Sequence, residues 1–244
     1  MRGMRVGVAG VLALAVAVAQ EPKATLMNGM EPTKILERAY AFLQVQPAFS
    51  VEAVTVNEDP YRTMMVTEVR HKLRIDLKRP GTVRVRIDGD SKHRDYLMEE
   101  GRFLIWDRST GLYGELKTPE TVDGTLDYLY DRFGISTPLA NLLYSDLTER
   151  LRPRARGVDF GLRLLDGVWC RYLGFANDKK ELQVWIRAGG DPLIQRFVLI
   201  DKTTPLRLHS ATTLHWLSVG RVTGKPFELN LPANAHRIPI EPAP

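Results

Sequence analysis

The chain has 244 residues, of which 44% are hydrophobic and 26% are charged, and it carries a formal net charge of +5 and a single cysteine. These proportions are typical of an ordinary folded domain, and they exclude disorder, collagen-like repeats and a small disulfide-rich scaffold. No segment approaches the roughly 20 consecutive apolar residues of a membrane-spanning helix, so a polytopic membrane protein is excluded as well.

The N-terminus has the three-part pattern of a secretory signal. Two early arginines precede an apolar run of about 14 residues, Val6 to Ala19, which ends in small residues just before Gln20. This pattern predicts a signal peptide over residues 1–19 that is cleaved before Gln20. The alternatives are a retained anchor or a core segment, but the run is too short to span a bilayer unaided.

The expected mature chain begins with a polar, irregular leader over residues 20–30. Removal of the signal takes away Arg2 and Arg5 and no acidic residue, so the mature chain is only mildly basic. That balance does not indicate a nucleic-acid-binding protein, which needs a strong basic bias with interleaved aromatic residues. No membrane span is expected after cleavage.

The first predicted element is a helix from about Pro32 to Gln44. Proline suits the first helical turn, and Pro47 lies just beyond the predicted end. The apolar residues fall on one helical face, at Ile35, Leu36, Ala39, Phe42 and Leu43.

From Phe49 the hydrophobic period changes from about 3.6 to 2, which indicates strands. Odd positions between Met65 and Lys78 are mainly apolar, whereas even positions from Glu68 onward are charged. Pro80-Gly81 predicts a turn into a second strand with the same alternation, so that the two form a long antiparallel hairpin. Further strands are predicted near residues 94–99, 102–107 and 112–117.

Residues 121–151 interrupt the strands with helical patterns. Leu126, Leu129, Tyr130 and Phe133 have helical spacing, and Gly134 is a plausible terminator. Thr137-Pro138 is expected to open a second helix that carries Leu139, Leu142 and Leu143, and a short turn is expected after Asp146.

The last third returns to strands, predicted at about residues 157–165, 168–176, 181–187, 193–201 and 206–217. Many antiparallel strands with few helices indicate the α+β class, in a single domain over residues 31–240. So large a sheet must curl, and its concave apolar face needs a filling. We therefore expect a half-barrel whose concave face is plugged by the helices.

Motifs of catalysis are absent from the sequence. There is no Gly-x-Ser-x-Gly elbow, no His-Glu-x-x-His, no Cys-x-x-Cys and no phosphate-binding glycine loop, so no catalytic residue, metal or cofactor is predicted. His209 and His215 share one strand face but are about 20 Å apart on an extended strand, too far to bind one metal ion. Cys170, beside Val168 and Trp169, is predicted to be a buried structural residue.

A basic cluster follows the polar face of the first hairpin and has two interpretations. It consists of Lys72, Arg74, Lys78, Arg79, Arg84 and Arg86. It could contact anionic lipid headgroups or an acidic protein, or it could be a solvated outer face that discourages edge aggregation; the second interpretation is favoured.

The dominant feature is a large apolar surface with two interpretations of its own. If the helices pack permanently, it is a core; if they can lift, it can accept acyl chains, because each buried methylene contributes about 0.8 kcal/mol. The candidate cavity residues are Met65, Val69, Leu73, Ile75, Val83, Val85, Leu126, Leu129, Tyr130, Phe133, Leu142 and Leu143.

Several segments carry a resemblance to a known family. They are Thr137–Asp146 (TPLANLLYSD), Asp166–Cys170 (DGVWC), Val184–Ile186 (VWI), Gly190–Leu193 (GDPL) and Phe227–Ala235 (FELNLPANA). With these segments the chain resembles a bacterial family of predicted periplasmic proteins of unknown function, over residues 31 to 240. The order of elements resembles the wider superfamily of periplasmic lipoprotein carriers, which includes LolA, LolB and RseB-type sensors. The resemblance implies a soluble periplasmic half-barrel whose helices cover a cavity for lipid or an acylated protein.

Three functions are compatible with these observations. The first is a non-enzymatic periplasmic protein that binds or carries a hydrophobic ligand. The second is a cell-envelope interaction or sensor protein with a closed core and a protein partner. The third is a hydrolase with a dispersed site, which requires a polar cluster with strongly shifted pKa values inside a cleft.

Overall fold

The computed structural model describes residues 29–62, 65–151 and 155–243, so the expected signal peptide and most of the leader lie outside the described residues. The helical elements are α1 (Pro32–Gln44), α2 (Val122–Phe133), the 3-10 turn η1 (Ala140–Leu142) and α3 (Leu147–Arg150). The strands are β1 (Ala48–Tyr61), β2 (Met65–Lys78), β3 (Thr82–Gly89), β4 (His93–Glu99), β5 (Arg102–Asp107), β6 (Leu112–Lys117), β7 (Gly157–Leu165), β8 (Val168–Ala176), β9 (Lys180–Arg187), β10 (Ile194–Asp201), β11 (His209–Val219) and β12 (His236–Arg237).

All described strands belong to one open sheet. Their order is β12-β6-β5-β4-β3-β2-β1-β11-β10-β9-β8-β7, and neighbours are antiparallel except for the short β12–β6 pair. The sheet is curled and not closed, which confirms the predicted half-barrel and its class. Because β11 pairs with β1, the last third of the chain extends the sheet begun by the first third.

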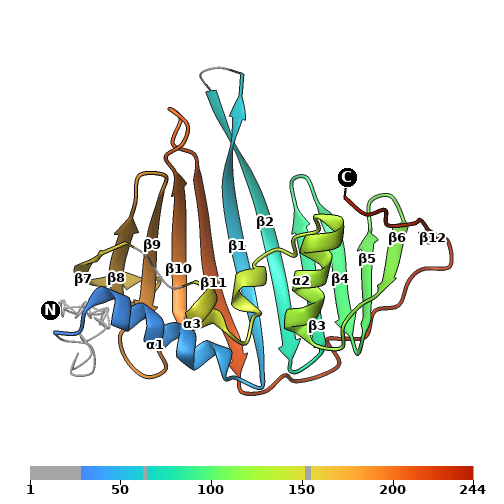
Figure 1. Cartoon of the computed structure of the whole chain (residues 1–244), viewed down its shortest axis with the longest axis horizontal. Helices are drawn as coiled ribbons and strands as arrows, with labels where there is room; N and C mark the ends of the chain where they lie inside the picture. The colour runs from blue at the N-terminus through green and yellow to red at the C-terminus, as the bar shows by residue number, and fades with distance from the viewer. Residues whose placement is uncertain (1–28, 63–64, 152–154, 244) are drawn as a thin grey trace, which may run out of the picture.

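The helices cover one face of this sheet. Figure 1 shows α1 across the β7–β11 half and α2 along β3 and β4, while the upper ends of β9–β11 and the tall β1–β2 hairpin rise beyond the helices. Side chains of α1, α2, η1 and α3 share one buried cluster with the inward residues of the strands, among them Phe49, Ile75, Val85 and Ile186. The predicted plug is therefore real, and it covers only part of the concave face.

Local chemistry explains where α1 and α2 begin and end. Pro32 stands in the first turn of α1, which has the predicted bounds. The Thr121 hydroxyl accepts a hydrogen bond from the Gly124 N–H at the start of α2, and Gly134 ends this helix in the left-handed region at φ 61°.

The helix predicted from Thr137-Pro138 is wrong. Leu139 adopts a left-handed φ of 56°, which an L-residue with a branched side chain rarely takes, and only the 3-10 turn η1 follows it. Helical propagation stops there, and residues 135–143 form a loop that returns across the concave face. The apolar spacing of Leu139, Leu142 and Leu143 arose from inward-pointing loop residues rather than from a helical face.

Candidate functional site

The structure divides the twelve predicted cavity residues into three groups. Eight are buried in the cluster between sheet and helices: Leu73, Ile75, Val83, Val85, Leu126, Leu129, Leu142 and Leu143. Val69 and Phe133 are half-buried, whereas Met65 and Tyr130 are 61% and 66% exposed. The apolar surface recognised in the sequence is thus largely brought together, and most of it is occupied by protein side chains.

An unfilled cavity of about 360 Å³ lies farther along the same face. Its floor is formed by strands β9, β10 and β11, and it is covered by Tyr40 of α1 and by residues 136–142. Of the predicted residues it contains Leu142 alone; the other lining residues are Tyr40, Thr55, Ser136, Thr137, Pro138, Leu139, Ala140, Asn141, Leu151, Leu182, Val184, Ile194, Phe197, Leu199, Ser210 and Thr212. Leu199 is 42% exposed, so the cavity opens toward solvent at the end of β10.

The chemistry of this cavity is apolar with a few hydroxyl groups. Leucine, isoleucine, valine and phenylalanine side chains of β9 and β10 form most of the floor. The hydroxyls of Thr55 and Thr212 lie 3.4 Å apart, and the Ser210 hydroxyl donates to Asn57 Oδ1 at 2.6 Å. Burial raises the pKa of Tyr40, so its phenol stays neutral. Such a surface suits an uncharged, hydrophobic ligand.

The loop over the cavity, residues 135–143, has few attachments of its own. Its backbone hydrogen bonds are local: Ile135 N–H bonds Leu129 O, and Ala140 and Leu142 N–H bond the carbonyls of Thr137 and Leu139. Within the described residues, no side chain of this loop makes a hydrogen bond to the sheet. It is therefore held chiefly by packing over the cavity.

The segment just after this loop is firmly attached to α2. The Tyr144 hydroxyl donates to Asp127 Oδ1 at 2.9 Å, Arg150 bonds both Asp127 oxygens at 3.0 and 2.8 Å, and its guanidinium lies 3.9 Å from the Tyr144 ring centroid. Arg150 and Tyr144 lower the pKa of Asp127, whereas burial and the bond to Asp127 raise the pKa of Tyr144 to about 12. We call Asp127, Tyr144 and Arg150 the latch, because they fix the far end of the loop.

A second, open hollow of about 640 Å³ lies on the other side of the same loop. It shares Ser136, Thr137, Ala140, Asn141 and Leu151 with the cavity, and α2 and the latch complete its wall. The loop is thus a partition that has space on both sides.

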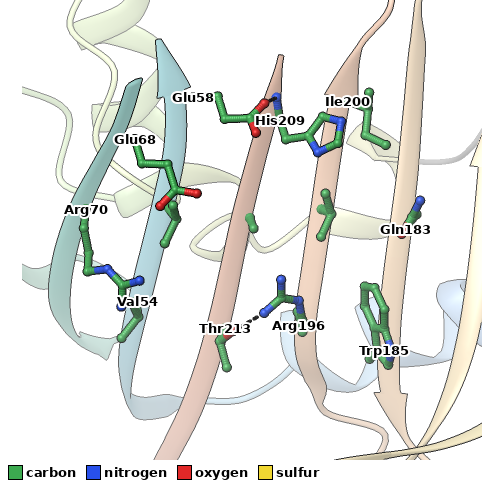
Figure 2. A pocket seen from close by; sticks show the side chains of 13 residues that line it. Val54, Glu58, Glu68, Arg70, Gln183, Trp185, Arg196, Ile200, His209 and Thr213 are labelled. Atoms are coloured by element: carbon green, nitrogen blue, oxygen red, sulfur yellow. Dashed lines mark hydrogen bonds between the residues drawn. The ribbon is translucent and has the colours of Figure 1, made fainter. Parts of the chain in front are cut away.

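The opposite face of the sheet carries a broad groove of about 580 Å³ (Figure 2). Its charged groups are Glu58 of β1, Glu68 and Arg70 of β2 and Arg196 of β10, and β11 adds the imidazole of His209. Several of its polar groups already bond one another. Arg196 donates to Thr213 at 3.1 Å, and Glu58 accepts from the His209 backbone N–H at 2.7 Å.

Aromatic stacking continues this groove across the sheet. Arg196 lies 5.8 Å from the Trp185 ring centroid, and Trp185 stacks on Tyr172 at 4.3 Å. Because these rings cover each other's faces and the floor is open, the groove defines no specific ligand. The covered cavity is the better candidate site.

Most side chains of the basic cluster form ion pairs within the chain. Arg84 pairs with the buried Asp95 at 2.7 Å and donates to the Pro226 carbonyl, and Arg74 pairs with the buried Asp76 at 3.1 Å. The C-terminal segment around Pro226 and Glu228 thus covers part of the hairpin face that the alternation predicted to be solvated. The expectation of a solvated hairpin face is wrong at Asp76 and Arg84, whereas Arg74 and Arg86, 38% and 51% exposed, remain at the surface.

Cys170 is fully buried, as predicted, and burial raises the pKa of its thiol to about 11. In the part of the chain that the structure describes, no group of three or more His, Cys, Asp or Glu side chains is placed to hold a metal ion. No helix there is long and apolar enough to cross a membrane.

Sequence reasoning missed the β9–β11 wall of the cavity. The sequence predicted a strand at residues 181–187, but none of its apolar residues, Leu182, Val184 and Ile186, was named as a cavity residue. It did not reveal that α1 and the loop leave this wall only partly covered, because that depends on where distant elements cross the sheet.

A family model described as "Predicted periplasmic protein (DUF2092)" matches residues 33–241. The chain belongs to the DUF2092 family. The description of the family agrees with the periplasmic location expected above. No curated protein matches this DUF2092 chain.

The DUF2092 chain is also similar to several solved structures. An uncharacterized conserved protein from Thermus thermophilus is 11% identical, with 84% of this chain and 97% of that chain covered and a TM-score of 0.47. LprF from Mycobacterium bovis is 12% identical, with 84% and 97% covered and a TM-score of 0.45. A LolA superfamily protein from Nitrosomonas europaea is 11% identical, with 76% and 91% covered and a TM-score of 0.37. At these identities and TM-scores, the neighbours carry no information about ligand or activity.

Proposed function

We propose that this periplasmic DUF2092 protein binds a hydrophobic chain, such as an acyl chain of a lipid or of an acylated protein, in the cavity beneath residues 135–143. The observation that supports the proposal is an apolar cavity of about 360 Å³ that opens to solvent beside Leu199 and is roofed by a loop with only local hydrogen bonds. Small-molecule sites are concave, mainly apolar and roughly 300–1,000 Å³ in volume, and this cavity has those properties.

Hydrophobic burial sets an upper limit on the affinity. At about 0.8 kcal/mol per methylene, burial of ten methylenes contributes about 8 kcal/mol. That sum corresponds to a dissociation constant of about 1 μM before the costs of association and ordering are subtracted. One chain would therefore be held reversibly, which suits a binding or carrier protein.

The ligand enters the cavity when the loop moves, and α2 stays in place. Leu129 of α2 is fully buried against the sheet, and the latch holds residue 144 onward, so both ends of the loop are fixed. Residues 136, 137, 140 and 141 border the space on both sides and can shift while Leu142 and Leu143 stay packed in the core. We infer that residues 135–143 act as a lid.

The lining supports binding rather than catalysis. Its hydroxyl groups belong to Thr55, Thr137, Ser136, Ser210, Thr212 and Tyr40, and no described residue of the lining is a His, Asp, Glu, Lys or Cys that could activate one of them. The polar cluster with shifted pKa values is the latch, where Asp127 is ion-paired and Tyr144 titrates near 12, far from the range of a general acid or base at neutral pH.

The test is displacement of a fluorescent acyl probe from the mature protein, compared with a cavity-filling variant. Ala140 is half-buried and faces both spaces, so Ala140→Phe should fill the cavity and reduce probe affinity at least tenfold. Ala176→Phe, at the exposed end of β8, is the matched control and should leave binding unchanged. If the wild type fails to bind the probe at micromolar concentration, the carrier proposal is wrong and the envelope-interaction alternative gains support.

A further inference from the structure

One buried polar group in the lid has no partner. The Thr137 side chain is 2% exposed, and its hydroxyl makes no hydrogen bond within the described chain, although its backbone carbonyl accepts from Ala140 N–H at 3.0 Å. A buried hydroxyl without a partner is destabilising, and such groups are rare in folded proteins. The presence of a buried, unpaired hydroxyl at Thr137 therefore requires an explanation.

The position of Thr137 suggests one. Thr137 borders both the apolar cavity and the open hollow, so a ligand that occupies both would pass close to it. The hydroxyls of Thr55, Thr212 and Ser210 are already within hydrogen-bonding distance of one another or of Asn57. Thr137 thus combines a buried, unused hydrogen-bond donor with a position between the cavity and the hollow.

The charges around Thr137 disfavour an anionic group buried at its hydroxyl. Among the described residues, none of those lining the cavity is charged. In the hollow, Arg150 already pairs with Asp127 and Asp146, and Asp131 would repel an anion. A buried carboxylate would therefore lack a counter-ion, and burying an unpaired charge is strongly unfavourable.

We propose, on the basis of the function above, that the ligand is a neutral acyl ester. Its carbonyl oxygen accepts a hydrogen bond from the Thr137 hydroxyl, its hydrocarbon chain fills the cavity, and its uncharged head lies in the hollow. The ester can come from a glycerolipid or from the diacylglyceryl group of a lipoprotein, since the atoms at Thr137 are the same.

The first experiment compares ligands on the wild-type mature protein. Monodecanoylglycerol and a diacylglyceryl-cysteine peptide represent the two sources of the ester, and decanoate and n-decane serve as the charged and the purely apolar probes. At least one ester should bind about tenfold or more tightly than decanoate. Equal binding of decanoate and both esters would overturn the neutral-ester inference and leave the carrier function intact, whereas absence of binding by all four probes would overturn the carrier function itself.

The second experiment removes the Thr137 hydroxyl and keeps the shape of the side chain. Thr137→Val should weaken binding of the preferred ester about fivefold, the factor for one neutral hydrogen bond, without weakening n-decane. The same variant should raise the Tm of the ligand-free protein by about 2–4 °C, because an unsatisfied buried group is lost. Lower affinity together with higher stability is a signature that a merely structural role would not give.

Two controls accompany this variant. Thr212→Val changes a hydroxyl in the same cavity that already lies near Thr55, and it should leave the preference for ester over n-decane unchanged. Thr137→Ser keeps the donor and should keep the wild-type preference, even if the valine variant folds poorly. Unchanged ester affinity in Thr137→Val, or loss of the preference in Thr137→Ser, would overturn the assignment of Thr137.

Discussion

Truncation of Leu129 tests whether α2 is a fixed part of the core. Leu129 lies in the middle of α2, is fully buried, and belongs to the cluster that joins the helices to the sheet. Leu129→Ala removes its packing and leaves a cavity, which costs about 2–5 kcal/mol in well-packed cores. Because Leu129 has no exposed surface, we expect a loss of at least about 3 kcal/mol, in the upper part of that range.

The assay is urea unfolding of the mature chain followed by tryptophan fluorescence, with the free energy of unfolding extrapolated to water. Tyr130→Ala is the matched control on the same helix; because Tyr130 is 66% exposed, we expect a change within about 0.5 kcal/mol. Affinity for the acyl probe should be similar in both variants. A loss below about 1 kcal/mol for Leu129→Ala, with altered probe binding, would show that α2 itself moves and would refute the assignment of the lid to residues 135–143.

Two further predictions concern charged and titrating groups. Arg84→Ala should destabilise the protein by about 2 kcal/mol, because it removes the hydrogen bonds of Arg84 to the buried Asp95, which keeps Arg108 as its second ion-pair partner. Arg86→Ala, at the surface, should cost less than about 1 kcal/mol by the same urea assay; equal losses would contradict the ion-pair assignment. Tyr144 has its pKa raised to about 12 in the folded state, so its contribution is complete below pH 10 and lost as the pH rises from 10 toward 12. Burial also raises the pKa values of Tyr40 and Tyr172, so absorbance titration should show several late-titrating tyrosines, and Tyr144→Phe should remove one of them. An unchanged titration curve in Tyr144→Phe would refute the latch at that residue.

Much of the fold could be predicted because alternation and helical spacing are local signals. The bounds of α1 and β2 follow directly from apolar periodicity and from the prolines beside them. The class and the curled sheet follow from the number of strands and from the one-sided apolar surface. Cys170 is buried for the reason that its apolar neighbours indicated.

The remaining features depend on contacts between distant segments. Asp76 and Arg84 occupy even, polar positions of the hairpin, yet Asp76 is 3% exposed and Arg84 bonds the carbonyl of Pro226, because the C-terminal segment crosses that face. The left-handed Leu139 ended a helix that its spacing had predicted. The cavity arises where α1 and this loop do not fully cover β9–β11. No local sequence pattern predicts how far these elements extend over the sheet.

The most direct test of the carrier function is native mass spectrometry of the mature protein, isolated gently from the periplasm of its own host. We predict a population heavier than the bare chain by the mass of one acylated ligand, released on denaturation and absent from Ala140→Phe prepared in the same way. Bare chain alone in the wild type, with no uptake after incubation with acyl lipids, would contradict the claim that the space beneath residues 135–143 exists to hold a hydrophobic guest.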